Sequence, residues 1–327
     1  MSTATWAVLS DNLTYSAIAV YVFAMLAFAA ETARRVAQVS ALARPEALVL
    51  AGAPPALIDT SPSRSEVETA GAGSDRSRRV GAIAVAVTTL AFLLNLGSVV
   101  ARGIAAQRAP WGNMYEFTLV AGVAAGAAFL FCLTRQPVRE LGVWIVAVIV
   151  LALGLGVTVL YTPVDALMPV LNSYWLVIHV AAAITSGGVF TLGAVAAVLL
   201  LLRSRADRRA LPGTPVRGYA ATLPSSETLS RLTHTAHMFA FPIWTFAVIA
   251  GAIWAENSWG RYWGWDPKET WAFITWVLYA AYLHAQATPN WRGSKASWFA
   301  IAGYTAFIFN FFGVNMWIPG LHSYAGV

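Results

Sequence analysis

The sequence predicts an all-α integral membrane protein with about eight transmembrane helices. Three observations support this fold class: 58% of the 327 residues are hydrophobic, only 11% are charged, and the apolar residues gather in long stretches. Soluble domains carry roughly 25% charged residues, so this chain has too little polar surface to cover a water-soluble globule of its size. We expect one polytopic membrane domain over residues 1–327.

Each predicted helix is an apolar stretch that can cross a bilayer core of about 30 Å, which takes roughly 20 helical residues. In chain order the stretches are Tyr15–Ala33, Val80–Ala101, Phe117–Leu133, Leu141–Leu160, Tyr174–Leu202, Thr235–Trp254, Trp271–Ala287 and Trp298–Trp317. No Lys or Arg precedes Arg34, so the basic start of a signal peptide is missing. The first stretch is therefore expected to stay as a spanning helix.

The distribution of basic residues predicts the orientation of these helices. The predicted helices cross the membrane in alternating directions, so their connections lie on two sides. Of the 21 Lys and Arg residues, 17 lie in the connections on one side, and the other side holds Arg102, Arg108, Arg261 and Lys268. Basic connections stay in the cytoplasm. We therefore expect the N-terminus and the C-terminus outside, with residues 34–79 and 203–233 as cytoplasmic loops. Both loops resemble solvated linkers, although docking to another protein is an alternative.

Charge and cysteine content restrict the kind of partner. The net charge of +6 would suit a nucleic-acid binder only if the basic residues gathered on one solvated face. They lie instead in short connections, so no nucleic-acid partner is expected. The single cysteine, Cys132, lies inside an apolar stretch and offers neither a disulfide nor a Cys-x-x-Cys pair. Any thiol chemistry must come from a partner.

Residues 254–271 form a tryptophan-rich segment, which the predicted orientation of the helices places outside. The segment holds five of the 14 tryptophans, namely Trp254, Trp259, Trp263, Trp265 and Trp271. One interpretation is an interfacial aromatic belt, because Trp favours the headgroup level. A belt needs only one or two rings at each helix end, however. A platform of indole faces for a large planar ligand explains the run better.

The polar residues of this segment suggest two roles. Arg261 and Lys268 suit the carboxylates of a planar macrocycle. Asp266 and Pro267 are typical of a turn that starts a helix, with Pro267 near the first helical position. Glu269 then falls in the first turn, where a carboxylate favours the positive end of the helix dipole.

The five histidines decide where an iron porphyrin would fit, because imidazole is its usual axial ligand. His179 lies roughly 7 Å below the outer edge of its helix, and His322 follows the last helix, so both share the level of the tryptophans. His284 lies roughly 22 Å down its helix and implies a second binding site in the inner half of the membrane. Interhelical hydrogen bonding is the structural alternative for a membrane histidine. His234 and His237 begin the sixth helix, where an interfacial position is favoured over a contact between His237 and His284.

A smaller cluster, Ala109–Phe117, opens the third helix on the outer side. Its Glu116 is costly at membrane depth unless it is paired. It either braces the tryptophan platform or caps the helix, and the sequence leaves both alternatives open.

In these motifs the sequence resembles the CcsA/ResC family, which is called CcsB in some bacteria. The resemblance rests on Trp259–Trp271, which matches the WWD motif of this family, and on Pro110–Glu116, Tyr174–His179, Gly313–Asn315 and Gly320–Tyr324. The WWD motif is shared with the CcmC and CcmF haem handlers. The chain length, the eight helices and the His-Ser-Tyr ending favour CcsA.

The resemblance implies a haem-handling subunit of the system II cytochrome c synthetase in the bacterial cytoplasmic (inner) membrane, with its haem site facing outside. It implies haem b as cargo, His179 and His322 as axial ligands at the outer site, and His284 as the transmembrane haem ligand. The other implied haem-binding residues are Trp259, Arg261, Trp263, Trp265, Asp266, Lys268 and Trp271. His234 and His237 match no ligand of the family. No catalytic residue is assigned.

The partners that the resemblance implies are a CcsB/ResB-type membrane protein, an apocytochrome c with a Cys-x-x-Cys-His motif, and a thiol-reducing thioredoxin-like protein. The complex would act as a holocytochrome c synthase, or haem lyase. Two alternatives remain at this stage. The chain could export haem without attaching it, or it could be a membrane assembly scaffold whose aromatic segment docks a protein.

Overall fold

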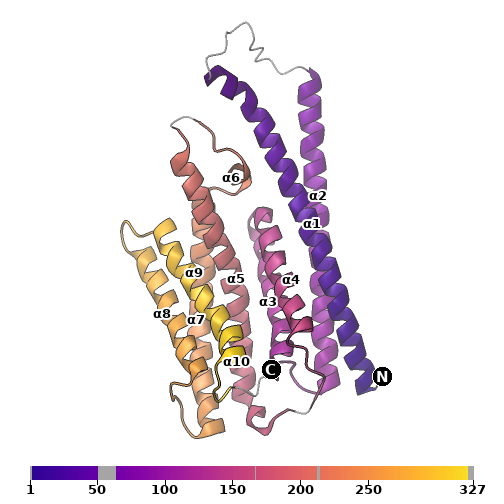
Figure 1. The fold of residues 1–327 in the computed structure, drawn as a ribbon, viewed down its shortest axis with the longest axis vertical. Coiled ribbons are helices and arrows are strands. Elements are labelled where there is room, and N and C mark those ends of the chain that lie inside the picture. The colour runs from indigo at the N-terminus through magenta and orange to yellow at the C-terminus, as the bar shows by residue number, and fades with distance from the viewer. Residues whose placement is uncertain (1, 51–63, 166, 212–213, 323–327) are drawn as a thin grey trace.

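The computed structural model describes residues 2–50, 64–165, 167–211 and 214–322, and within these ranges every long regular element is a helix. The predicted all-α class is confirmed. The long helices are α1 (Thr3–Leu50), α2 (Arg64–Ala106), α3 (Met114–Arg135), α4 (Gly142–Thr158), α5 (Tyr174–Arg209), α7 (Ser226–Trp259), α8 (Pro267–Ala287) and α9 (Ser294–Ile308). Two short helices, α6 (Tyr219–Thr222) and α10 (Val314–Trp317), complete the set shown in Figure 1.

Seven of these helices are long and apolar enough to cross a membrane. The expected span Trp271–Ala287 forms helix α8, yet it is not among the seven. Lys268 and Glu269 in its first turn and several Trp and Tyr rings lower its hydropathy. In Figure 1 helix α8 nevertheless lies beside α9 at one side of the bundle.

The long connections contain far more helix than expected. Helix α1 continues to Leu50 and α2 already begins at Arg64, so a linker over 34–79 is wrong for the described parts of that range. Residues 51–63 lie outside the described residues. Similarly, α5 continues to Arg209 and α7 begins at Ser226, which shortens the connection predicted over 203–233. Ala, Leu, Glu and Arg are strong helix formers, so helices continue past the apolar stretches.

The helices are arranged from α1 and α2 at one side of the bundle, through α3, α4, α5 and α7, to α8 and α9 at the other side (Figure 1). Helix α5 is packed tightly in the middle, where Gly188 faces α3 so closely that a Cβ atom would lie 2.6 Å from the backbone carbon of Ala124. Small residues allow such close approach of membrane helices.

The end of the last predicted helix departs from α-helical geometry. The expected stretch Trp298–Trp317 is divided into α9, a π-helical turn over Phe309–Gly313, and α10. Such π-helical turns occur mainly inside α-helices and often at functional sites. This turn lies beside the tryptophan-rich segment.

The start of α1 and the described end of the C-terminal tail lie at the same end of the bundle as the tryptophan-rich segment (Figure 1). Chain ends on the same side of a membrane require an even number of crossings, such as the eight helices expected from the sequence. The assignment of that end to the outer face stays a prediction. Ser323 and Tyr324, which contribute to the family resemblance, lie outside the described residues.

Candidate functional site

A pocket of about 1180 Å³, open mouth included, lies where α7 ends and α8 begins. Its walls come from α3, α5, α7, α8, the π-helical turn and the C-terminal tail. Aromatic rings dominate them: Trp111, Phe117, Trp244, Trp254, Trp259, Tyr262, Trp263, Phe307 and Phe311. Ligand sites are typically apolar with a few polar groups that set orientation.

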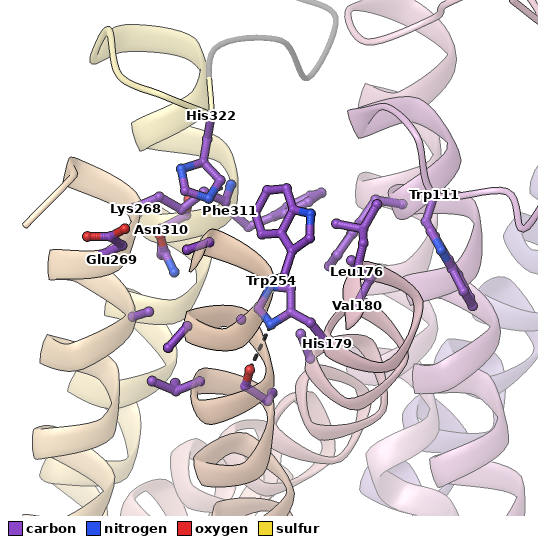
Figure 2. A pocket seen from close by; sticks show the side chains of 18 of the residues that line it. Trp111, Leu176, His179, Val180, Trp254, Lys268, Glu269, Asn310, Phe311 and His322 are labelled. Carbon is purple, nitrogen blue, oxygen red and sulfur yellow. Dashed lines mark hydrogen bonds between the residues drawn. The ribbon is translucent and has the colours of Figure 1, made fainter. Parts of the chain in front are cut away.

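His179 enters this pocket from the first turns of α5, as Figure 2 shows. Its Nδ1 lies 2.7 Å from the carbonyl oxygen of Ala247 in α7. Because a carbonyl only accepts, Nδ1 carries the hydrogen and Nε2 is the nitrogen with a lone pair for coordination. Gly251 makes room for the ring, since a Cβ atom at this position would lie 2.7 Å from Nδ1.

His322 reaches the same pocket from the C-terminal tail (Figure 2). Its Nδ1 lies 2.8 Å from Oδ2 of Asp266, and only 17% of its side chain is exposed. The same carboxylate accepts the backbone N–H of Leu321 at its Oδ1, also at 2.8 Å. The structure thus brings together two histidines that lie 143 positions apart in the sequence.

The pKa of His322 and the pKa of Asp266 are both lowered in this contact. Burial lowers the pKa of His322, although the hydrogen bond with Asp266 opposes the shift. Partial burial alone would raise the pKa of Asp266, but the hydrogen bonds from His322 and Leu321 outweigh it and lower that pKa to about 2. At neutral pH Asp266 is therefore ionised.

Trp254 touches both imidazoles. Its indole is nearly parallel to the ring of His179, with centroids 6.4 Å apart, and meets the ring of His322 edge-on at 5.8 Å. The indole nitrogen donates to the carbonyl oxygen of Val170 at 3.3 Å. Trp259 packs on both Trp254 and His322, with centroids 4.8 and 5.0 Å away. These two tryptophans form the wall between the histidines.

The remaining tryptophans of the segment divide into two groups. Trp263 lines the pocket, whereas Trp265 and Trp271 do not. Trp265 is 65% exposed and packs on Phe273 of α8. Trp271 packs on Phe309 of the π-helical turn. The predicted platform is thus not one surface, because the start of α8 points these two rings away from the pocket.

Arg261 and Lys268 differ in their partners. Arg261 pairs with Glu269 at 3.2 Å, and Glu269 also accepts the backbone N–H groups of Gly264 and Asp266. With Asp266 as N-cap and Pro267 in the first turn, this capping box confirms the predicted helix start. Lys268 lines the pocket instead, and its Nζ contacts Oδ1 of Asn315 at 2.8 Å. No carboxylate among the described residues pairs with it.

Glu116 is paired, as its depth requires. Its carboxylate forms salt bridges with Nε of Arg102 at 3.1 Å and with Nη1 of Arg108 at 2.7 Å. It also accepts the N–H of Gly112, which lines the pocket beside Trp111. The helix cap is supplied by Asn113, whose side chain accepts the N–H of Glu116. The structure therefore favours the bracing role of the Glu116 side chain over the capping role.

The other three histidines lie elsewhere. His284 is on an exposed face of α8 and outside the pocket, and His234 is exposed near the start of α7. His237 is fully buried, with its Nδ1 2.7 Å from the carbonyl oxygen of Thr233 and its ring against Tyr282. His237 thus packs inside the helix bundle, because α7 begins well before the apolar stretch, and its expected position at the membrane interface stays a prediction.

Some pocket residues were not predicted. Trp244 and Phe307 come from the middle of apolar helices, where nothing distinguishes them from other core residues. Asn310 enters through the π-helical turn, which has no simple sequence signature. Asn315 and Trp111 belong to motifs that carry the family resemblance, but the motifs alone did not show that they face the ligand site.

Comparison with known proteins shows the family of this chain. Residues 111–322 match the profile of the family described as Cytochrome C assembly protein. Cytochrome c biogenesis protein CcsA of Microcystis aeruginosa is 31% identical over 295 residues, covering 75% of this chain and 87% of that protein. Its counterpart in Guillardia theta is 38% identical over 169 residues, covering 48% of this chain and 56% of that protein.

A solved structure, Cytochrome c Heme Lyase CcmF, has a similar fold, with a TM-score of 0.63 at 17% sequence identity. The similarity covers 95% of this chain but 47% of the CcmF chain, so the present chain spans about half of that protein. The profile match runs from Trp111 at one wall of the pocket to His322 at the other. The chain is therefore a multi-pass membrane protein that belongs to the cytochrome c assembly protein family, as the CcsA proteins of cytochrome c biogenesis do.

Proposed function

We propose that this chain is the haem-handling subunit of a system II cytochrome c synthetase, which moves haem to the outer face of the membrane and presents it to an apocytochrome. The observation that carries the proposal is the convergence of His179 and His322 on one aromatic pocket. Each imidazole has its Nδ1 engaged by a protein acceptor, Ala247 or Asp266. Nε2 is therefore the nitrogen that each histidine would offer to iron.

The pocket residues suit the cargo. Indole and phenyl rings provide apolar area and stacking for a planar macrocycle. Lys268 lines the pocket and would donate to a propionate group, whereas Arg261 is already paired with Glu269. Trp254, which packs near both imidazoles, would contribute to the aromatic wall against the macrocycle.

The chemistry that this site would support is addition of a thiol to a vinyl group. Each addition forms one carbon–sulfur bond and transfers the thiol hydrogen to a vinyl carbon, so no leaving group is needed. The chain would contribute proximity and orientation by holding the iron through two imidazoles while the vinyl groups face the two thiols of a Cys-x-x-Cys-His motif. The histidine of that motif would then displace one of the two ligands.

His284 fits a separate haem site in the inner half of the membrane. It lies 16 residues beyond Lys268 along α8, roughly 24 Å at 1.5 Å per residue, so it cannot share the iron of the outer pocket. Its exposed position on α8 leaves the second ligand to a partner, for which a CcsB/ResB-type protein is the proposed source. A thioredoxin-like protein would keep the apocytochrome thiols reduced.

The test is co-expression of the chain with its membrane partner and an apocytochrome in a host that lacks other maturation systems. The purified complex should show the visible spectrum of haem with two imidazole ligands, and the cytochrome should carry covalent haem. Haem at the outer site without covalent attachment would support the exporter alternative. A complex that never contains haem, yet is still required for maturation, would support the scaffold alternative.

A further inference from the structure

One carboxylate joins the C-terminal tail to the start of helix α8. Asp266 accepts the backbone N–H of Leu321 and the ring Nδ1–H of His322, both at 2.8 Å. It also accepts the backbone N–H of Lys268 at 3.2 Å. Asp266 and His322 are 56 positions apart in the sequence. The tail thus depends on a residue of the tryptophan-rich segment for its position.

The two sides of this contact differ in rigidity. Asp266 is the N-cap of α8, and Pro267 and the capping box with Glu269 hold it there. Leu321 and His322 lie in a turn beyond α10 and belong to no helix. The side chain of Asp266 ties this turn to the start of α8 through the backbone N–H of Leu321 and the ring of His322. A helix cap therefore positions a segment that is not helical.

Gly320 provides independent support for this contact. A Cβ atom at this position would lie 2.8 Å from Oδ1 of Asp266 and 3.3 Å from Cδ of Pro267. Only a residue without a side chain lets the tail come this close to the carboxylate. Local sequence and hydrogen bonding therefore agree on the same docking geometry.

We propose that Asp266 is a positioning residue that docks the tail and orients His322 as an iron ligand, and this proposal rests on the function proposed above. A carboxylate that accepts from Nδ1–H fixes the tautomer of a ligating histidine and strengthens its Nε2 as a donor. His179 is held by a neutral carbonyl oxygen instead. The two ligands thus differ: His179 belongs to a helix and contacts a neutral carbonyl oxygen, whereas His322 lies in the tail and contacts a carboxylate.

The first experiment measures the tail without haem. Amide hydrogen exchange of the C-terminal peptide is followed by mass spectrometry on the full chain in detergent, for the wild type and for Asp266→Asn and Gly320→Ala. Asn is as good an N-cap as Asp, so Asp266→Asn keeps the start of α8 while it removes the charge. Gly320→Ala keeps the carboxylate and forces the tail away. Loss of charge-assisted hydrogen bonds should speed exchange of the Leu321 amide about tenfold in both variants.

The matched control is Glu256→Gln, which neutralises a carboxylate at the same end of the bundle that does not line the pocket. Its tail should exchange at the wild-type rate. Wild-type exchange in both test variants would overturn the docking role, as would an equal acceleration in Glu256→Gln.

The second experiment measures the ligand in the haem-loaded complex with the partner. A weaker imidazole donor stabilises ferric iron less, so Asp266→Asn should raise the reduction potential of the outer haem and change its ferric electron paramagnetic resonance spectrum. An unchanged potential and spectrum would overturn the orienting role. A wild-type complex without haem would instead overturn the proposed function, while the exchange experiment would still decide whether Asp266 docks the tail.

Discussion

The imidazole of His179 lies nearly parallel to the indole of Trp254, with an angle of 8° between the ring planes. The ring is thereby held between an aromatic wall and the carbonyl oxygen of Ala247. This histidine is part of a helix and is well ordered by its neighbours, which is the condition for a metal ligand that keeps its orientation.

His179→Ala should abolish haem at the outer site and reduce cytochrome c maturation at least about tenfold, because loss of one of two strong axial ligands removes most of the iron affinity. The measurement is the haem content of the purified complex together with the yield of covalent cytochrome. His234→Ala is the control, since this histidine is exposed and lies outside the pocket. Normal haem content and maturation in His179→Ala would exclude the ligand role.

Trp263→Ala should lower haem occupancy, whereas Trp265→Ala should leave it close to the wild type. The two residues are neighbours in the same motif, but only Trp263 lines the pocket, and Trp265 is 65% exposed. Loss of one stacked ring is worth about 1 kcal/mol or more, which corresponds to a several-fold weaker affinity. Haem titration of both variants checks this difference. A lower haem occupancy in Trp265→Ala than in Trp263→Ala would show that the motif uses its exposed ring to bind haem.

The pair Trp263 and Trp265 also shows how far the sequence could predict the site. Density of tryptophan located the segment, and helix depth placed His179 and His322 at its level. The direction of each ring could not be predicted, because it depends on Gly264, the positive φ of Trp265 and the network around Glu269. The π-helical turn that brings Asn310 and Phe311 into the pocket was equally hidden in an apolar stretch.

The fold was easier to predict than the site for a physical reason. Length and apolarity place a helix in a membrane almost regardless of its neighbours. The ends of the helices were less predictable, since Ala- and Arg-rich extensions such as 34–50 remain helical beyond the apolar stretch. The burial of His237 among the helices was not predicted, because α7 has such an extension at its start.

Lys268→Met should remove the preference of the pocket for the carboxylates of haem. Nζ of Lys268, whose contact in the pocket wall is Oδ1 of Asn315, would bind a propionate through a charge-assisted hydrogen bond, worth about tenfold or more in affinity. We expect the wild type to bind iron protoporphyrin IX more tightly than its dimethyl ester, and the variant to bind both equally. Lys295→Met, which changes an exposed lysine outside the pocket, is the control. A preference that persists in Lys268→Met would assign the propionates to another residue.

Glu116→Gln should destabilise the protein strongly. The carboxylate is fully buried between Arg102 and Arg108, and Arg102 itself is 1% exposed. Removing its charge leaves two arginines without a counterion, which costs about 3–5 kcal/mol when one partner of a buried ion pair is lost. The measurement is the free energy of unfolding in a mixed-detergent titration.

Glu227→Gln is the matched control for this substitution, because Glu227 pairs with Arg231 on an exposed helix surface. Such surface pairs contribute little, so its unfolding midpoint should stay close to the wild type. Since Glu116 also holds the N–H of Gly112 at the pocket wall, haem occupancy of Glu116→Gln should fall together with stability. A stable Glu116→Gln protein with normal haem content would show that neither the ion pairs nor the bracing contact matters for the site.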